Sequence, residues 1–229
     1  MELSILLLTL NEASNLKVLI PELKEVARRL GIDAEIVVID GASTDGTIET
    51  ARQLGVIAHS QKQKGYGAAF RESISYAKGL YVLTLDADGS HPPSFLETLW
   101  KSRGHNRTVI ASRFVAGGST AAPAHRTLLS RILNGLTRLA LSISVADCTS
   151  GYRLYSRELL DAANYRCSHF AIQIEVLADV IAKGSSIVEC PLAYQPRAEG
   201  DSKARIIGFS SEYLQLLLRL FLRRMSGAK

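Results

Sequence analysis

The sequence predicts an α/β fold in which helices cover both faces of a mostly parallel β-sheet. Short apolar runs alternate with longer stretches whose apolar residues recur at helical spacing. The apolar runs contain few polar residues, as expected for strands that are buried on both faces. The chain has 229 residues, 47% of them hydrophobic, which excludes a disordered chain and suits one large domain.

The first half of the chain contains five expected strands separated by expected helices. The strands are residues 3–8, 35–39, 56–59, 80–85 and 109–111. The helices are residues 15–30, 44–54 and 65–77, and one that opens at Pro92-Pro93, where proline in the first turn loses no hydrogen bond. Alternation of this kind gives parallel strands, whose carboxyl ends share one edge of the sheet.

The second half has longer helical stretches and more polar connections. Expected helices cover residues 126–142, 170–182 and 206–224. Expected loops and turns cover residues 115–124, 147–153 and 196–203. Residues 187–194 are expected to form one strand that Pro191 interrupts, which places it at a sheet edge. We expect a main domain at residues 1–205 and an amphipathic helix within residues 206–229.

The composition restricts the partners and the compartment. The net charge of +5 favours anionic partners, but no basic stripe interleaved with aromatic residues points to nucleic acid. No apolar run is long enough for a membrane-spanning helix, and no basic segment precedes the first apolar run, so we expect no secretory signal. The odd number of cysteines, Cys148, Cys167 and Cys190, predicts free thiols in a reducing cytoplasm.

Polar residues follow three of the expected strands: Asn11-Glu12, Asp40, and the pair Asp86 and Asp88. Alternation along a strand places Asp86 and Asp88 on the same side, where two carboxylates repel unless a cation lies between them. Mg²⁺ or Mn²⁺ commonly binds one or two carboxylates together with substrate phosphates. The pair therefore indicates metal-assisted handling of a diphosphate, with Asp88 on a solvent-facing loop. A plain solvated turn is the alternative.

Seven segments in order resemble the polyprenol-phosphate mannosyltransferases, also called dolichol-phosphate-mannose synthases. The segments are residues 9–12, 40–47, 64–69, 86–93, 112–118, 147–153 and 197–203. The resemblance runs from residue 3 to about residue 220 and implies the GT-A (Rossmann-like) fold of the second family of inverting glycosyltransferases. It also implies an activity, the transfer of a hexose, foremost mannose from GDP-mannose, to a polyprenyl or dolichyl monophosphate.

The resemblance implies roles for individual residues. The groups implied to hold the base and ribose of the donor nucleotide are Thr9, Asn11, Glu12, Ile39 and Asp40. Those implied to face the ribose and diphosphate are Asp86, Ala87 and Asp88. Asp88 is implied to be the main ligand of Mg²⁺ or Mn²⁺, and Ser90 a second ligand, directly or through water.

Basic residues are implied to bind the two phosphate-bearing substrates. Arg113, Arg126 and Ser130 would receive the acceptor phosphate, and Arg197 and Lys203 would close on the donor diphosphate from a flexible loop. Guanidinium groups suit phosphate oxygens because they donate paired hydrogen bonds. The alternative is that Arg113 is a surface ion-pair partner, Arg126 a surface residue at a helix start, and Arg197 and Lys203 ordinary loop charges.

A phosphate acceptor removes the need for a general base, because it is already anionic at neutral pH. His91 is a candidate base, but we favour a residue at a helix start that bonds the backbone. We expect Glu175 to orient a basic site residue. Gly65 and Gly67 are expected to begin a helix without touching phosphate.

The sequence departs from the family pattern on the nucleotide side. Gly41 stands where the family usually has a second Asp, and Thr9, Leu10 and Ala42 also differ. Three alternatives therefore stay open: another donor of the UDP-glucose type, a saccharide acceptor, and a non-catalytic module that binds nucleotide sugars.

The C-terminal segment, residues 206–224, has an apolar face interrupted by Arg219, Arg223 and Arg224. An arginine near the centre makes a membrane span costly, whereas a helix lying in the membrane surface suits this pattern. Packing on the chain's own core or on a partner is the alternative. We expect peripheral association with the cytoplasmic membrane face, through this helix or a membrane-anchored subunit.

Overall fold

A computed structural model describes residues 1–195 and 206–226, with only the backbone described for residues 206–210. Seven of the described strands form one sheet in the order β3-β2-β1-β4-β7-β5-β8. They are β1 (Leu3–Thr9), β2 (Ala34–Asp40), β3 (Ile57–Ser60), β4 (Tyr81–Asp86), β5 (Arg107–Ser112), β7 (Arg153–Ser156) and β8 (Ser186–Pro191). All neighbours are parallel except β7, which is antiparallel to β4 and β5. The expected mostly parallel α/β fold is confirmed.

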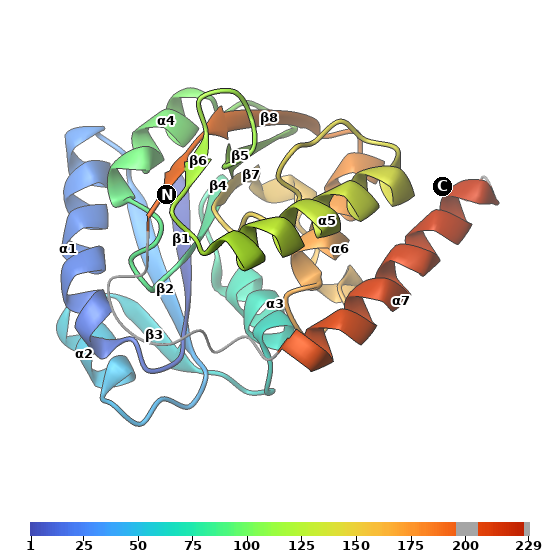
Figure 1. Cartoon of the computed structure of the whole chain (residues 1–229). Helices are drawn as coiled ribbons and strands as arrows, with labels where there is room; N and C mark the ends of the chain where they lie inside the picture. Colours follow the sequence, from blue (N-terminus) through green and yellow to red (C-terminus); the bar gives the residue numbers. More distant parts are fainter. Residues whose placement is uncertain (196–205, 227–229) are drawn as a thin grey trace.

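Helices cover both faces of this sheet (Figure 1). On one face lie α1 (Ala13–Arg29), α2 (Thr47–Gln53) and α4 (Leu96–Lys101). On the other lie α3 (Tyr66–Tyr76), α5 (Ala124–Leu141), α6 (Ile172–Ala182) and α7 (Ile206–Met225). Single 3₁₀ turns occupy Pro93–Phe95, Arg157–Leu159 and Ala162–Asn164.

The strands are apolar on both sides because each side faces a separate core. Ile5 and Leu7 of β1 pack against the α1 layer, and Leu6 between them packs against the opposite layer. Each of these side chains is almost completely buried, and burial of a Leu or Ile stabilises the fold by about 1.5–3 kcal/mol. The three cysteines are buried in these cores as free thiols, as predicted.

The structure corrects three expectations about the second half. Residues 147–153 are not only a turn, because Arg153 begins strand β7, which lies between β4 and β5. The loop at 115–124 contains a short strand, β6 (Ser119–Thr120). The strand expected at residues 187–194 stops at Pro191; β8 is an edge strand as predicted, but β9 (Ala193–Tyr194) pairs with β6 in a second sheet.

The C-terminal helix α7 packs lengthwise against α5 (Figure 1). Tyr213, Leu216 and Leu217 are buried in the core on this side, and the Tyr213 hydroxyl donates a hydrogen bond to the Leu133 carbonyl at 3.1 Å. One face of α7 thus packs on the chain's own core, as the alternative interpretation held. Among the described residues, no helix has the length and hydropathy to cross a membrane. The division at residue 205 stays a prediction.

Candidate functional site

The polar residues that follow β1, β2 and β4 meet at the carboxyl edge of the sheet. In the strand register Thr9 lies beside Asp40 on β2, and Leu8 lies beside Asp86 on β4. Strands β2 and β4 lie on opposite sides of β1, so the strand order reverses at this point of the sheet. Ligands of open parallel sheets bind at such a point. The predicted grouping of these residues is therefore confirmed.

Asp40 organises the loop after β2. It is 2% exposed, and its Oδ1 accepts hydrogen bonds from the hydroxyls of Thr9 at 3.1 Å and Ser43 at 2.5 Å. Its Oδ2 accepts from the Ser43 backbone N–H at 2.9 Å. The side chain of Asn11, whose φ is +52°, accepts from the Thr44 N–H at 2.9 Å. These bonds fix the two loops that the resemblance assigns to the base and ribose.

Asp45, which the sequence analysis did not single out, ties these loops to two helix starts. Its carboxylate accepts from the Ala13 N–H at 3.0 Å and from the hydroxyl and N–H of Thr47. Burial tends to raise the pKa of Asp45, but these hydrogen bonds lower it overall. The neighbouring Glu12 is buried, accepts from Asn15 at 2.6 Å, and donates its backbone N–H to Thr47. The loops that the resemblance assigns to the nucleotide are therefore held in place by their own hydrogen bonds.

The segment after β4 places Asp88 differently from the expectation. Asp88 is 5% exposed rather than solvent-facing, and its Oδ1 accepts from the backbone N–H of Ser90 at 3.1 Å and from its hydroxyl at 2.5 Å. Ala87 packs into the core on the α1 side. The carboxylate of Asp86 is partly exposed and lies beside Gly151, which has no Cβ that would contact it.

His91 bonds the backbone, as the favoured interpretation held. Its Nδ1 accepts from the Asp86 N–H at 3.0 Å, and its ring stacks on Tyr152. Burial lowers the pKa of His91 and outweighs the opposing charges of Asp86 and Asp88. The imidazole is therefore neutral at neutral pH, and it positions the acidic segment rather than abstracting a proton.

The donor atoms of this segment fit a hard divalent cation. Asp86 and Asp88 supply carboxylate oxygens and Ser90 a hydroxyl oxygen, the ligand type that Mg²⁺ and Mn²⁺ prefer. Among the described residues, no cluster of three or more His, Cys, Asp or Glu could hold a metal unaided.

A basic, hydroxyl-lined cluster lies at the end of β5. Arg113 forms a two-pronged ion pair with the fully buried Asp147, at 2.7 and 2.8 Å. The same guanidinium donates to the hydroxyls of Thr149 at 2.8 Å and Ser130 at 3.2 Å. Burial tends to raise the pKa of Asp147, but hydrogen bonding and the charge of Arg113 lower it overall. Arg113 is thus already an ion-pair partner, although in a largely buried pair and not at the surface as the alternative held.

Residues 4–163 match the sequence family described as Glycosyl transferase family 2. This chain belongs to that family. The glycosyltransferase is 31% identical over 210 residues to the polyprenol monophosphomannose synthase of Mycolicibacterium smegmatis, covering 85% of this chain and 78% of that protein. It is 30% identical over 229 residues to the dolichol-phosphate mannosyltransferase of Pyrococcus furiosus, covering 96% of this chain and 64% of the length of that protein.

Solved structures share the fold of this glycosyltransferase. Mannosyl-3-phosphoglycerate synthase from Rubrobacter xylanophilus aligns with a TM-score of 0.74 at 21% identity, over 99% of this chain and 74% of that one. Glucosyl-3-phosphoglycerate synthase from Mycobacterium tuberculosis, in complex with Mn²⁺, UDP and glucosyl-3-phosphoglycerate, aligns at 0.70 and 22% identity, over 97% and 79%. The expected GT-A fold is confirmed.

The other residues predicted to bind phosphate in this glycosyltransferase are Arg126, Arg197 and Lys203. Arg126 is exposed near the start of α5, one helical turn before Ser130, so the two share a face of that helix. Arg197 and Lys203 lie outside the described residues. The predicted roles of these side chains stay predictions.

Two residues near Asp86, Gln173 and Tyr66, were not predicted as site residues. The side-chain amide of Gln173 donates a hydrogen bond to the Tyr66 hydroxyl at 2.9 Å. Burial, and to a smaller extent the negative charge of Asp86, raises the pKa of Tyr66. Gly65 and Gly67 lie at the start of α3 as expected, and position 67 requires glycine because a Cβ there would lie 2.0 Å from the Cys167 carbonyl oxygen. Glu175 does not orient a basic residue; it accepts from the N–H groups of residues 166 and 167.

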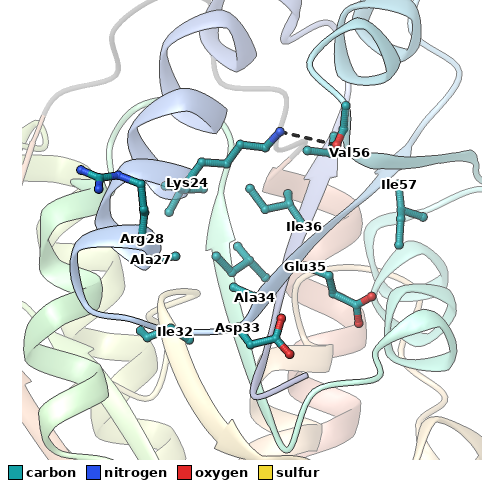
Figure 2. A pocket seen from close by; sticks show the side chains of 13 residues that line it. Lys24, Ala27, Arg28, Ile32, Asp33, Ala34, Glu35, Ile36, Val56 and Ile57 are labelled. Atoms are coloured by element: carbon teal, nitrogen blue, oxygen red, sulfur yellow. Dashed lines mark hydrogen bonds between the residues drawn. The ribbon is translucent and has the colours of Figure 1, made fainter.

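A groove of about 480 Å³ opens at the opposite edge of the sheet, beside the start of β2 (Figure 2). Figure 2 shows Lys24 reaching from α1 toward the turn before Val56, where it donates to the Gly55 carbonyl at 3.5 Å. It also donates to the Leu54 carbonyl at 2.6 Å. Asp33 pairs with the N-terminal amine, and Glu35 accepts from Ser4. These charges are engaged in holding the fold, and the groove lies at the start of β2, whereas the candidate site lies at the strand's carboxyl end.

Proposed function

We propose that this glycosyltransferase moves a hexose, foremost mannose from GDP-mannose, to a polyprenyl monophosphate with inversion. One observation carries the proposal. Helix α5 carries Ser130, whose hydroxyl accepts a hydrogen bond from Arg113 in the site. The same helix also carries five large apolar residues that are exposed. A polar cluster that continues into an apolar helix face suits an acceptor with a phosphate head and a hydrocarbon tail. The names of the two curated relatives support the same acceptor class.

On this proposal Asp88, supported by Asp86 and Ser90, holds Mg²⁺ or Mn²⁺ on the donor. The ion supplies neutralisation of the charge that develops on the leaving nucleoside diphosphate. The Mn²⁺ in the structure of the mycobacterial glucosyl-3-phosphoglycerate synthase supports a divalent ion in this fold. The buried hydrogen bonds of Asp88 to Ser90 hold its carboxylate in one orientation before any substrate arrives.

The acceptor phosphate serves as the nucleophile without a general base. His91 is neutral and bonded to the backbone, and Glu175 is bonded to two backbone N–H groups, so neither is placed to remove a proton. Arg126 and the guanidinium of Arg113 would hold the phosphate in line with the anomeric carbon. Such positioning supplies much of the rate of a two-substrate reaction.

A donor screen tests the function. Purified protein with Mg²⁺ or Mn²⁺ and a polyprenyl monophosphate is expected to convert GDP-mannose to a lipid-linked mannose, detected by mass spectrometry. Preference for the base and preference for the sugar are distinguished by testing GDP-glucose, UDP-mannose and UDP-glucose as donors. The acceptor control replaces the lipid phosphate by a glycoside. Nucleotide binding without any product would instead support a non-catalytic binding module.

We further propose that α5 and α7 together lie on a membrane surface. Of the 15 large hydrophobic residues that are exposed within the described part of the chain, ten lie on these two helices. They are Leu128, Leu129, Ile132, Leu136 and Leu139 on α5, and Leu214, Leu218, Phe221, Leu222 and Met225 on α7. The same helices carry six arginines and a single acid, Glu212, which accepts from the Ser168 and His169 N–H groups. An apolar and cationic surface of this kind suits anionic lipid.

Co-sedimentation with liposomes tests this surface. Replacing Arg219, Arg223 and Arg224 by Gln is expected to weaken binding to anionic vesicles and to change binding to neutral vesicles little, because only the charge contribution is lost. Binding of the wild-type protein to anionic vesicles should also weaken as salt rises from about 0.1 to 1 M, because the Debye length shortens and the charges are screened. The matched control replaces Arg28, Arg29 and Arg52 by Gln on the opposite layer. Equal losses in both triple variants would contradict a defined surface.

A further inference from the structure

Three groups converge on the space beside Gly41, at the ends of β2 and β3. A Cβ added to Gly41 would lie 3.2 Å from the Thr9 carbonyl oxygen, 3.4 Å from Gln61 Oε1 and 3.6 Å from Leu10 Cδ1. Gly41 is half-buried, and Leu10 is 39% exposed. A side chain at position 41 would already touch these three groups, so glycine leaves two hydrogen-bond acceptors and an apolar side chain uncovered at this point.

The orientation of the Gln61 amide follows from its partners. Its Nε2 donates to the carbonyl of Gly65 at 2.8 Å and to the carbonyl of Gln63. Because both partners are acceptors, the nitrogen must face them, and the oxygen must face Gly41. The Gln61 backbone N–H donates to the Asp40 carbonyl at 2.8 Å, which fixes the main chain against β2. Gln61 thus presents a fixed acceptor oxygen to the space beside Gly41.

The place and polarity of this space suit the base of the donor nucleotide. The diphosphate belongs with Asp86 and Asp88 at the end of β4, and β1, β2 and β3 follow from there at spacings of about 4.8 Å. An extended nucleotide therefore reaches the ends of β2 and β3 with its base. Acceptor oxygens repel phosphate but bind ring N–H groups, and the Leu10 side chain offers an apolar contact to the ring face.

We propose that Gln61 is a specificity-determining residue whose Oε1 accepts a hydrogen bond from a ring N–H of the donor's base. Guanine and uracil carry such an N–H between or beside carbonyl groups, at N1 and N3 respectively. Adenine and cytosine have an acceptor nitrogen at the corresponding position, which would face the oxygen of Gln61 unfavourably. The proposal rests on the proposed function for the placement of the diphosphate, and it names the class of base that the site takes.

Calorimetry with nucleoside diphosphates and Mn²⁺ tests the proposal without needing sugar or lipid. Wild-type protein is expected to bind GDP or UDP more tightly than ADP and CDP. Gln61→Ala should weaken binding of the preferred nucleotide about tenfold. The analogue with a methyl group on that ring nitrogen should bind wild-type protein about tenfold more weakly and should lose nothing further in Gln61→Ala. The control is Gln63→Ala, whose exposed side chain lies in the same loop.

A second variant separates base reading from loop stability. Gly41→Asp in the Gln61→Ala background would place a carboxylate beside the same groups. Gly41 does not have a left-handed φ, and the 3.2 Å approach of a Cβ to the Thr9 carbonyl oxygen needs a shift of only a few tenths of an ångström. This double variant should regain preference for the unmethylated base. Equal loss for methylated and unmethylated nucleotides in Gln61→Ala would overturn the proposal, as would tight ADP or CDP binding by the wild type. Intact base selection without any lipid product would instead count against the proposed function alone.

Discussion

Asp88→Asn is expected to lower sugar transfer at least about 100-fold while leaving the fold intact. A carboxamide is a poorer ligand than a carboxylate for a hard divalent cation, so the donor diphosphate loses its main metal contact. The fold should survive because asparagine keeps one oxygen to accept the two hydrogen bonds from Ser90. Steady-state transfer at saturating Mg²⁺ and Mn²⁺, together with thermal melting, measures both parts.

The metal role of Asp88 also has a readout apart from turnover. Mn²⁺ should tighten GDP binding to the wild type and should tighten it much less in Asp88→Asn. The matched control is Asp161→Asn, which removes an exposed carboxylate that accepts hydrogen bonds within its own short turn, from Ala163 and Asn164. Transfer at near wild-type rate by Asp88→Asn, with metal-dependent nucleotide binding unchanged, would show that the metal assignment is wrong.

Much of the fold could be predicted because strand burial leaves a local signal. Strands β1, β2 and β4 are buried on both faces and appear in the sequence as runs of mostly apolar residues. Strand β7 gives no such signal, since it is four residues long and begins with Arg153. That arginine is fully buried and donates to the carbonyls of Cys148 and Gln173, a setting that only the folded chain reveals. The insertion of β7 between β4 and β5 was therefore not predictable.

The candidate site divides in the same way. The placement of Asp40, Asp86 and Asp88 close together was predictable, because each follows a parallel strand and the carboxyl ends of parallel strands lie at one edge of the sheet. The pairing of Arg113 with Asp147 joins residues 34 positions apart, and Gln61 reaches Gly41 from a neighbouring strand. Contacts of this kind depend on side-chain direction after folding, which periodicity does not specify. The sequence therefore indicated which chemical groups the site contains, but not the hydrogen bonds and ion pairs that those groups form with one another.

Arg113→Ala is expected to lose both stability and transfer. Asp147 is fully buried, so removing its partner leaves an uncompensated charge, which typically costs about 3–5 kcal/mol. Arg126→Ala is the control for the acceptor role, because this exposed residue should affect use of the lipid phosphate without changing stability. Urea denaturation and acceptor kinetics of both variants separate the two effects. A loss confined to nucleotide affinity would move these arginines to the donor side.

The stability loss in Arg113→Ala should depend on pH in a defined direction. In the wild type the pKa of Asp147 lies below its ordinary value of 3.8, so the pair stabilises the protein above that pH and fails only as pH falls through the lower, folded-state pKa. Without Arg113, burial is the dominant influence and raises the pKa of Asp147 above its ordinary value, so the folded variant takes up a proton more readily than the unfolded chain. The difference in unfolding free energy between wild type and variant should therefore be largest near neutral pH and should shrink as pH falls toward about 4. A difference that is the same at both pH values would mean that the buried charge of Asp147 is not what Arg113 compensates.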